Sequence, residues 1–171
     1  MPPFGDIRRR DRALTSDQAR EILARAEHGV LATVDAGGWP YAVPVNHVLS
    51  GDTLYIHCAL DGHKLDNIAH EERVSFCAVA TAQVLPLELS TVYESAIVFG
   101  RAALVTDAAE KRRALDLLAV RFCGAVTPEA EKTIADHGAR TAIIRIRIER
   151  ITGKARRPTP PPQPAPAVPS D

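Results

Sequence analysis

The chain has 171 residues, of which 46% are hydrophobic and 25% are charged, and its formal net charge is zero. This composition is typical of a globular protein of one domain, and a neutral chain lacks the bulk basicity on which nucleic-acid binding depends. No apolar run approaches the roughly 20 residues that cross a bilayer, so no membrane span is expected. The three cysteines are widely spaced, which favours reduced thiols in a cytoplasmic protein over a disulfide framework.

Composition divides the chain into three segments. Residues 1–12 are polar and basic and are predicted to be flexible. Residues 13–153 carry the apolar periodicity of one folded domain. Residues 154–171 are rich in proline and have no apolar period, so we expect an extended or disordered tail. Arginine-flanked proline tracts also occur in SH3-type ligands, but no other feature of this sequence indicates signalling.

The first predicted element is a helix, and three strands follow it. Residues 15–29 show helical apolar spacing, with Thr15 or Ser16 as the N-cap and Gly29 as the stop. The apolar period then changes to two and the connections are short turns, which predicts antiparallel strands. These strands cover residues 30–34, 41–49 and 53–59.

Two of these strands carry positional information. Pro44 has no N–H to donate, so it must lie at a sheet edge or at a bulge. Residues of the third strand alternate between two faces, and Tyr55 and His57 share one of them. The opposite, apolar face is formed by Leu54, Ile56 and Cys58.

The second half of the domain alternates helices with strands. The periodicity predicts a short helix at 62–72, and the last strand has one buried and one wet face. The remaining elements are strands at 73–82, 90–106 and 141–151 and helices at 107–122 and 128–138. The residues expected to point inward are Leu65, Ile68 and Ala69, then Leu115, Leu118 and Phe122, then Ala142, Ile144, Ile146 and Ile148.

This order of elements predicts a mainly β fold with flanking helices. Six strands with few helices hide their exposed edges best when the sheet closes into a small barrel. Because short loops join the early strands, the sheet is expected to be antiparallel.

The start of the helix at 62–72 has unusual charges. With Asp61 or Gly62 as the N-cap, His63 and Lys64 fall in the first turn, where free backbone N–H groups already form a positive pole. A bound phosphate would account for both the free N–H groups and the added cation. The alternative is that Lys64 points into water, with an unfavourable helix-dipole effect of only about 0.3 kcal/mol or slightly more.

Other polar residues lie close to this helix start in the predicted sheet. Asn46 and His47 interrupt an apolar strand, and His57 ends the next one. A face carrying Val43, Val45, Asn46 and Tyr55 suits a flat aromatic ring whose polar edge meets backbone amides and the Asn46 side chain. Taken singly, Asn46 and His57 are equally well explained as exposed strand residues.

Competing uses of these residues are less well supported. His57 and Cys58 point to opposite faces of a strand, and His63 and His70 lie two turns apart, so no metal site is expected. Cys58 shares an apolar face, which favours a small buried hydrophobe over a nucleophile. The sequence has neither a GxGxxG nor a P-loop motif.

Three stretches together resemble a known family. They are residues 29–68, 73–80 and 93–102. In order and spacing they are similar to the FMN-binding split-barrel superfamily of pyridoxamine 5'-phosphate oxidases, and most similar to its 5-nitroimidazole-resistance, nitroreductase-like branch. The resemblance covers roughly residues 8–152. It implies a six-stranded antiparallel split β-barrel that forms a homodimer with FMN at the subunit interface.

The resemblance also implies which residues hold the cofactor. The isoalloxazine ring would lie along Val43, Pro44, Val45 and Asn46, and the second protomer would contribute Glu94 and Ser95. The phosphate would be held by His57, Cys58, His63 and Lys64. The oxidases have Arg-Lys where this chain has His63-Lys64, which makes this phosphate clamp pH-dependent.

The implied activity is that of an FMN-dependent oxidoreductase. The flavin would carry electrons from a nicotinamide donor to a nitroaromatic or another small electrophilic substrate, with His57 or His47 as candidate proton donors. The oxidases end in a segment rich in Arg and His, whereas this chain ends in a proline-rich tail, so vitamin B6 oxidation is not expected. The alternatives are a non-catalytic flavin store or sensor, and a split barrel that binds a deazaflavin or heme.

Overall fold

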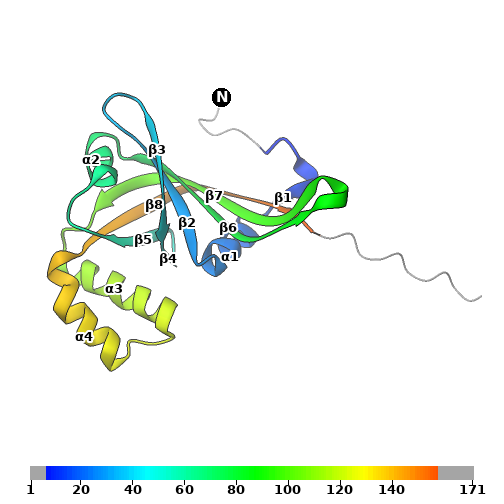
Figure 1. Cartoon of the computed structure of the whole chain (residues 1–171). Helices are drawn as coiled ribbons and strands as arrows, with labels where there is room; N and C mark the ends of the chain where they lie inside the picture. Colours follow the sequence, from blue (N-terminus) through cyan, green and yellow to red (C-terminus); the bar gives the residue numbers. More distant parts are fainter. Residues whose placement is uncertain (1–6, 158–171) are drawn as a thin grey trace, which may run out of the picture.

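An eight-stranded antiparallel sheet forms the frame of the molecule in the computed structural model, which describes residues 7–157. Seven strands follow the order β3-β2-β6-β7-β8-β5-β4, and β1 pairs with β8. The sheet curls until β3, at one edge, contacts β5, which lies next to the other edge (Figure 1). The fold is therefore mainly β, with the half-closed sheet of a split barrel, as predicted.

Four helices flank this sheet, and three short 3₁₀ turns complete the described chain. The strands are β1 (Ala13–Leu14), β2 (His28–Val34), β3 (Pro40–Asn46), β4 (Val48–Ser50), β5 (Thr53–Cys58), β6 (Arg73–Leu85), β7 (Ser90–Leu104) and β8 (Ala142–Arg156). The helices are α1 (Ser16–Arg25), α2 (His63–His70), α3 (Ala108–Cys123) and α4 (Pro128–His137), and the turns are η1 (Arg10–Arg12), η2 (Pro86–Glu88) and η3 (Gly138–Arg140).

The number of strands differs from the predicted six for two reasons. The strand predicted at 41–49 is divided at His47, because β3 pairs with β2 while β4 pairs with β5 at the other edge of the sheet. The two-residue strand β1 was not predicted. The chain must bend at His47 to pass from one edge of the sheet to the other. The apolar pattern of residues 41–49 does not show where this bend lies.

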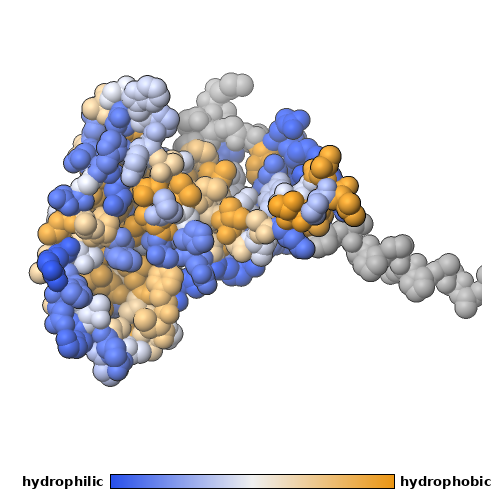
Figure 2. Space-filling view, viewed as in Figure 1, coloured by the Kyte–Doolittle hydropathy of each residue, from blue (hydrophilic) through white to orange (hydrophobic). Residues whose placement is uncertain are grey.

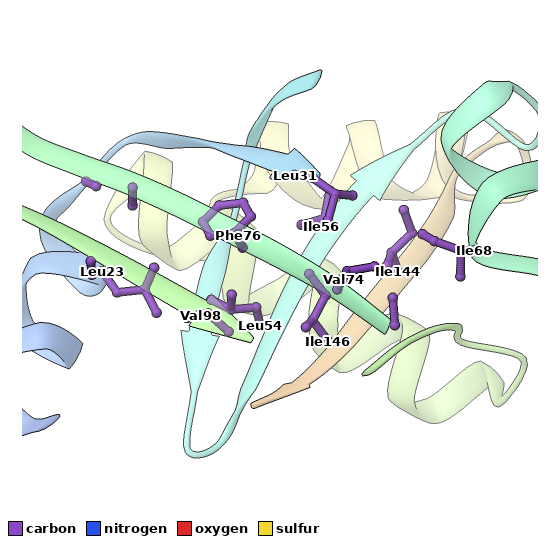
Figure 3. Close-up of a cluster of buried hydrophobic side chains, with 14 of the residues drawn as sticks. Leu23, Leu31, Leu54, Ile56, Ile68, Val74, Phe76, Val98, Ile144 and Ile146 are labelled. Carbon is purple, nitrogen blue, oxygen red and sulfur yellow. The ribbon is translucent and has the colours of Figure 1, made fainter. Parts of the chain in front are cut away.

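The main core fills the concave side of the sheet. Its strand residues come from the inner faces of β2, β5, β6, β7 and β8, and α1 and α2 cover it. The predicted inward residues Leu54, Ile56, Ile144 and Ile146 are all fully buried there. Figure 3 shows this cluster and labels Leu23, Leu31, Leu54, Ile56, Ile68, Val74, Phe76, Val98, Ile144 and Ile146.

A second, smaller core lies on the outer face of the sheet, where α3 covers β5 and β8. Tyr55 and Ile143 are buried in it, although their faces were not predicted to be covered by another element. The Tyr55 hydroxyl donates to Glu110 on α3 (3.0 Å), and Arg145 also binds Glu110 (2.9 Å). The predicted wet face of the last strand is therefore only partly wet.

Helix α1 ends earlier than predicted. Thr15 and Gln18 form a capping box at its start, but the helix stops at Arg25, and Gly29 lies within β2. A Cβ at position 29 would overlap the Phe76 ring. Gly29 therefore permits close packing of β2 on β6 rather than ending a helix.

Two inward assignments on other helices were wrong. Ala69 is exposed, and the buried residue on α2 beside Leu65 and Ile68 is Asn67. On α3, Leu118 is buried as predicted, but Phe122 is 45% exposed. Spacing alone does not show how wide a stripe of each helix the sheet covers.

The ends of the predicted domain also shift slightly. Strand β8 continues to Arg156, pairing Lys154 with Ala13 and Arg156 with Tyr93, so three residues assigned to the tail belong to the sheet. In the N-terminal segment predicted to be flexible, η1 forms and Arg9 binds Asp11 (2.6 Å). Residues 158–171 of the predicted tail lie outside the described residues, as do residues 1–6. Within the described range, no helix is long and apolar enough to cross a membrane.

Candidate functional site between β3 and the start of α2

The first turn of α2 has the features of an anion site. Gly62 is the N-cap, with φ of 126°, a left-handed conformation that favours glycine, and it has no side chain with which to cap the helix. The amides of Leu65 and Asp66 both bind the Gly62 carbonyl (2.8 and 3.3 Å). The N–H groups before them, those of His63 and Lys64, have no partner within the helix.

Two contacts hold this helix start against the β2–β3 hairpin. The rings of Tyr41 on β3 and His63 lie 4.6 Å apart, centroid to centroid, with an interplanar angle of 50°. The Asn67 amide donates to the Thr33 hydroxyl on β2 (2.9 Å), and both side chains are buried. The first turn of α2, which carries Lys64 and also Asp66, is thus positioned beside strand β3.

Cys58 at the end of β5 belongs to the same region. Burial raises the pKa of its half-buried thiol, and the nearby charge of Lys64 opposes part of that shift. The structure therefore brings together Cys58, His63 and Lys64, three of the four residues predicted to hold a phosphate. Because its pKa is raised, the Cys58 thiol is not activated as a nucleophile.

The fourth predicted residue, His57, faces the other way. Its side chain lies on the outer face of β5 and lines a cavity of about 410 Å³ between that strand, α3 and α4. Strand alternation separates it from the Cys58 side chain. Only the backbone of His57 stays close to the predicted phosphate site.

Strand β3 leaves backbone groups free because it is an edge strand. Asp35 N–H donates to the Trp39 carbonyl (3.0 Å), which marks this pair as hydrogen-bonded. Bonded and non-bonded pairs alternate along an antiparallel ladder, so Val43 and Val45 bond to β2. The backbone groups of Pro44 and Asn46 then point outward. The predicted edge position of Pro44 is confirmed, and its missing N–H falls where no ladder partner exists.

The side chains of residues 43–46, which were predicted to lie along the flavin ring, alternate between the two faces of β3. Val43 and Val45 are half-buried against the main core, whereas Pro44 and Asn46 are exposed. The Asn46 amide nitrogen donates to the Glu27 carbonyl (2.9 Å). This bond ties β3 to the chain between α1 and β2 and fixes the orientation of Asn46.

Glu94 and Ser95 lie elsewhere within one chain. Glu94 binds Arg25 (2.8 Å), and the Ser95 hydroxyl donates to the Lys154 carbonyl (3.4 Å). The part of β7 near α2 is Ala102, whose N–H donates to the Glu72 carbonyl (2.7 Å) just after that helix. Seven residues of strand, about 23 Å, separate Ala102 from Ser95. A single chain does not bring Glu94 and Ser95 to His63.

His47, the other candidate proton donor, is buried at the corner between β3 and β4. Its Nε2 lies 2.8 Å from the Leu23 carbonyl in the last turn of α1, and its ring meets Phe76 edge-on at 4.8 Å. Burial lowers the His47 pKa and keeps the imidazole neutral. His47 therefore acts as a structural residue that caps α1.

Three residues that position this site were not predicted from the sequence: Thr33, Tyr41 and Asn67. Asn67 carried a usable signal, because a polar residue next to the apolar stripe of a helix requires a buried partner. Tyr41 carried none, since its contact with His63 joins segments 22 positions apart. Within residues 7–157, no three His, Cys, Asp or Glu side chains gather as a metal site would require.

Comparisons with known proteins agree with this fold. The family model described as pyridoxamine 5'-phosphate oxidase matches residues 15–155, and a search of the curated proteins found no match. Similar solved structures include a conserved hypothetical protein from Mycobacterium tuberculosis, with a TM-score of 0.75 at 17% identity over 88% of this chain and 90% of that one.

Two further solved structures share the fold. One is a candidate 5-nitroimidazole antibiotic resistance protein from Bacteroides thetaiotaomicron, with a TM-score of 0.69, 22% identity, and coverage of 83% of this chain and 85% of that one. The other is the FAD and heme binding protein from Mycobacterium smegmatis, with a TM-score of 0.67, 23% identity, and coverage of 87% and 75%. With the family match spanning most of its length and its split-barrel sheet, this chain belongs to the pyridoxamine 5'-phosphate oxidase family.

Proposed function

We propose that the protein is an FMN-binding oxidoreductase that reduces nitroaromatic or other small electrophilic substrates. Membership of the family supports flavin binding, as does the similar fold of the Mycobacterium smegmatis protein, which binds FAD and heme. The similar candidate resistance protein supports a nitroimidazole-type substrate. The choice of FMN rests on the site of this chain.

The observation that carries the proposal is the contact between Tyr41 and His63. It sets the cationic first turn of α2 beside the free edge of β3. A phosphate at that turn would receive the N–H groups of His63 and Lys64 together with the Lys64 ammonium, in the manner of other helix N-termini.

Strand β3 fits the other end of a mononucleotide flavin. Outward carbonyl groups of Pro44 and Asn46, and the Asn46 N–H, supply acceptors and a donor for the polar edge of the isoalloxazine ring. Five residues of strand, about 17 Å, separate Tyr41 from Asn46. That length suits an extended ligand with a phosphate at one end and a ring at the other.

A homodimer completes the proposed site. Cross-strand neighbours Val30, Cys77 and Ile97 form a row on the outer face of the sheet, and Val30 and Ile97 are each 39% exposed. An apolar row of this kind on an uncovered sheet face suits a subunit interface. In the proposed dimer, Glu94 and Ser95 of the second protomer reach the flavin.

The bound flavin would supply the hydride transfer from a nicotinamide donor to the substrate. The residues of the chain would bind and orient it. His47 is buried and His57 faces the α3–α4 side, so neither is proposed as the proton donor.

The test begins with the absorption spectrum of the purified protein, alone and after addition of FMN. We expect a flavin spectrum, and chromatography of the released cofactor separates FMN from FAD, a deazaflavin and heme. Absence of flavin from the isolated protein, combined with no binding of added FMN, would overturn the proposal. Anaerobic mixing with NADH or NADPH should bleach the bound flavin, and a flavin that no donor bleaches would support the store or sensor instead.

A further inference from the structure

The β6–β7 hairpin ends in an exposed apolar tip. Strand β8 stops at Arg156, opposite Tyr93, so among the described residues the end of β6 and the start of β7 pair only with each other, on the two sides of η2. At this tip Leu87 is 102% and Leu89 95% exposed. Leu89 has φ of 45° and ψ of 46°, a left-handed conformation that is unfavourable for a bulky side chain. Two leucines held in water at a projecting tip indicate a partner surface.

A surface of matching chemistry lies at the other end of the same chain. The α3–α4 cavity, the space of about 410 Å³ between β5, α3 and α4, is lined mainly by apolar side chains. Phe122 at this cavity is itself 45% exposed. The principal lining residues are His57, Leu115, Leu118, Phe122, Cys123 and Ile134.

The tip and the cavity cannot meet within one chain. Figure 1 shows the β6–β7 tip at one end of the molecule and α3 and α4 at the other, and Figure 2 shows apolar residues gathered at both places. Between them lies the uncovered row of Val30, Cys77 and Ile97. This row is on the same outer face of the sheet that α3 covers farther along, at Tyr55 and Ile143.

A two-fold axis that lies between two such faces, parallel to the sheets and perpendicular to their strands, would exchange the two ends. Each tip would then meet the cavity of the other copy, and the contact would be reciprocal and closed. We propose that Leu87 and Leu89 of one protomer dock into the α3–α4 cavity of a second copy of this chain. The inference rests on the proposed homodimer and specifies how its two copies are joined.

A cross-linking experiment tests this placement, because Cys123 lines the cavity and is exposed. In the full-length Leu87→Cys variant, a short bis-maleimide should join residue 87 of one protomer to Cys123 of the other. We expect a covalent dimer on denaturing gels, with the 87–123 link identified by mass spectrometry.

Two variants serve as controls for the cross-link. Leu87→Cys combined with Cys123→Ser should lose this covalent dimer. Leu104→Cys, at another exposed leucine far from the tip along β7, should give no link to Cys123. A Leu87→Cys protein without the 87–123 link, whether monomeric or joined through other residues, would overturn the proposal.

A second measurement uses Leu87→Asp with Leu89→Asp. Both side chains are exposed in the single chain, so the variant should fold normally and keep the thermal midpoint of the isolated protomer. Its dimer dissociation constant should rise at least about tenfold, because charged groups would enter an apolar cavity. An unchanged dimer constant would refute the docking. The flavin spectrum of the wild-type protein is read separately, so loss of the proposed cofactor and loss of this contact are distinguishable.

Discussion

The His63 ring at the start of α2 packs against the Tyr41 ring on β3, with 4.6 Å between their centroids. This contact joins two segments that are separated in sequence by β4 and β5. It sets the distance between the free backbone edge of β3 and the cationic helix start. Any ligand that uses both features depends on it.

Tyr41→Ala should therefore weaken FMN binding without unfolding the protein. Loss of an aromatic pair removes about 1 kcal/mol of local interaction, so we expect a fall in FMN affinity of about fivefold, measured by quenching of flavin fluorescence. Tyr41→Phe keeps the ring contact and serves as the control. Equal affinities for the Ala and Phe variants would show that the contact does not position the site.

Lys64→Glu should weaken FMN binding by at least about 1.5 kcal/mol, because a charge-assisted contact is lost and a like charge is added near the phosphate. Isothermal titration measures the change. Lys132→Glu makes the same charge change on α4, at an exposed lysine, and should leave the affinity unaltered. An unchanged dissociation constant in Lys64→Glu would remove this residue from the site.

His63→Arg should strengthen FMN binding, because it places a permanently charged guanidinium at the first turn of α2, where two N–H groups can bind one phosphate. Isothermal titration measures the change. His70→Arg makes the same substitution at the other end of α2 and should leave the affinity unaltered. An unchanged dissociation constant in His63→Arg would show that the side chain at position 63 does not contact the phosphate.

Asn67→Ala should lower the free energy of unfolding by about 1–3 kcal/mol, because the buried Thr33 hydroxyl loses the hydrogen bond that the Asn67 amide donates to it. Urea denaturation measures this change. Combining it with Thr33→Val removes both polar groups and should recover part of the loss. A double variant that is no more stable than Asn67→Ala would show that this hydrogen bond is not the main contribution of Asn67.

The stability of the apo protein should fall as pH drops below about 6.5, the ordinary histidine pKa. Burial lowers the pKa of folded His47, so the unfolded chain binds more protons there and acid favours unfolding. Bonds to Arg9 and Arg73 hold the pKa of Asp11 and Glu71 at about 2, so these carboxyls titrate well below this range.

His47→Gln should reduce the loss of stability between pH 7.5 and pH 5, as followed by urea midpoints at the two pH values. The glutamine amide can still donate to the Leu23 carbonyl but takes up no proton in this range. If the wild type and the variant lose the same stability on acidification, His47 is not the source of this pH dependence.

Local patterns were sufficient where neighbours in sequence are neighbours in space. Alternation placed Leu54, Ile56, Ile144 and Ile146 in the main core, and Thr15, one of the two expected N-caps, caps α1. Lys64 lies close to Cys58, as expected, because only a short loop separates the end of β5 from α2. The charges at that helix start are a property of the sequence itself.

Contacts between distant segments were decided by the tertiary structure. Whether α3 covers Tyr55, whether the strand breaks at His47, and whether Gly29 faces Phe76 depend on how the sheet curls. The sequence by itself determined most of the strand positions and the presence of Lys64 at a helix start, because these arise from local spacing and side-chain chemistry. Its resemblance to a known family indicated the split barrel. The cavity that His57 lines beside α3 and α4, and the meeting of Tyr41 with His63, were decided only by the tertiary structure, because each joins segments that are distant in sequence.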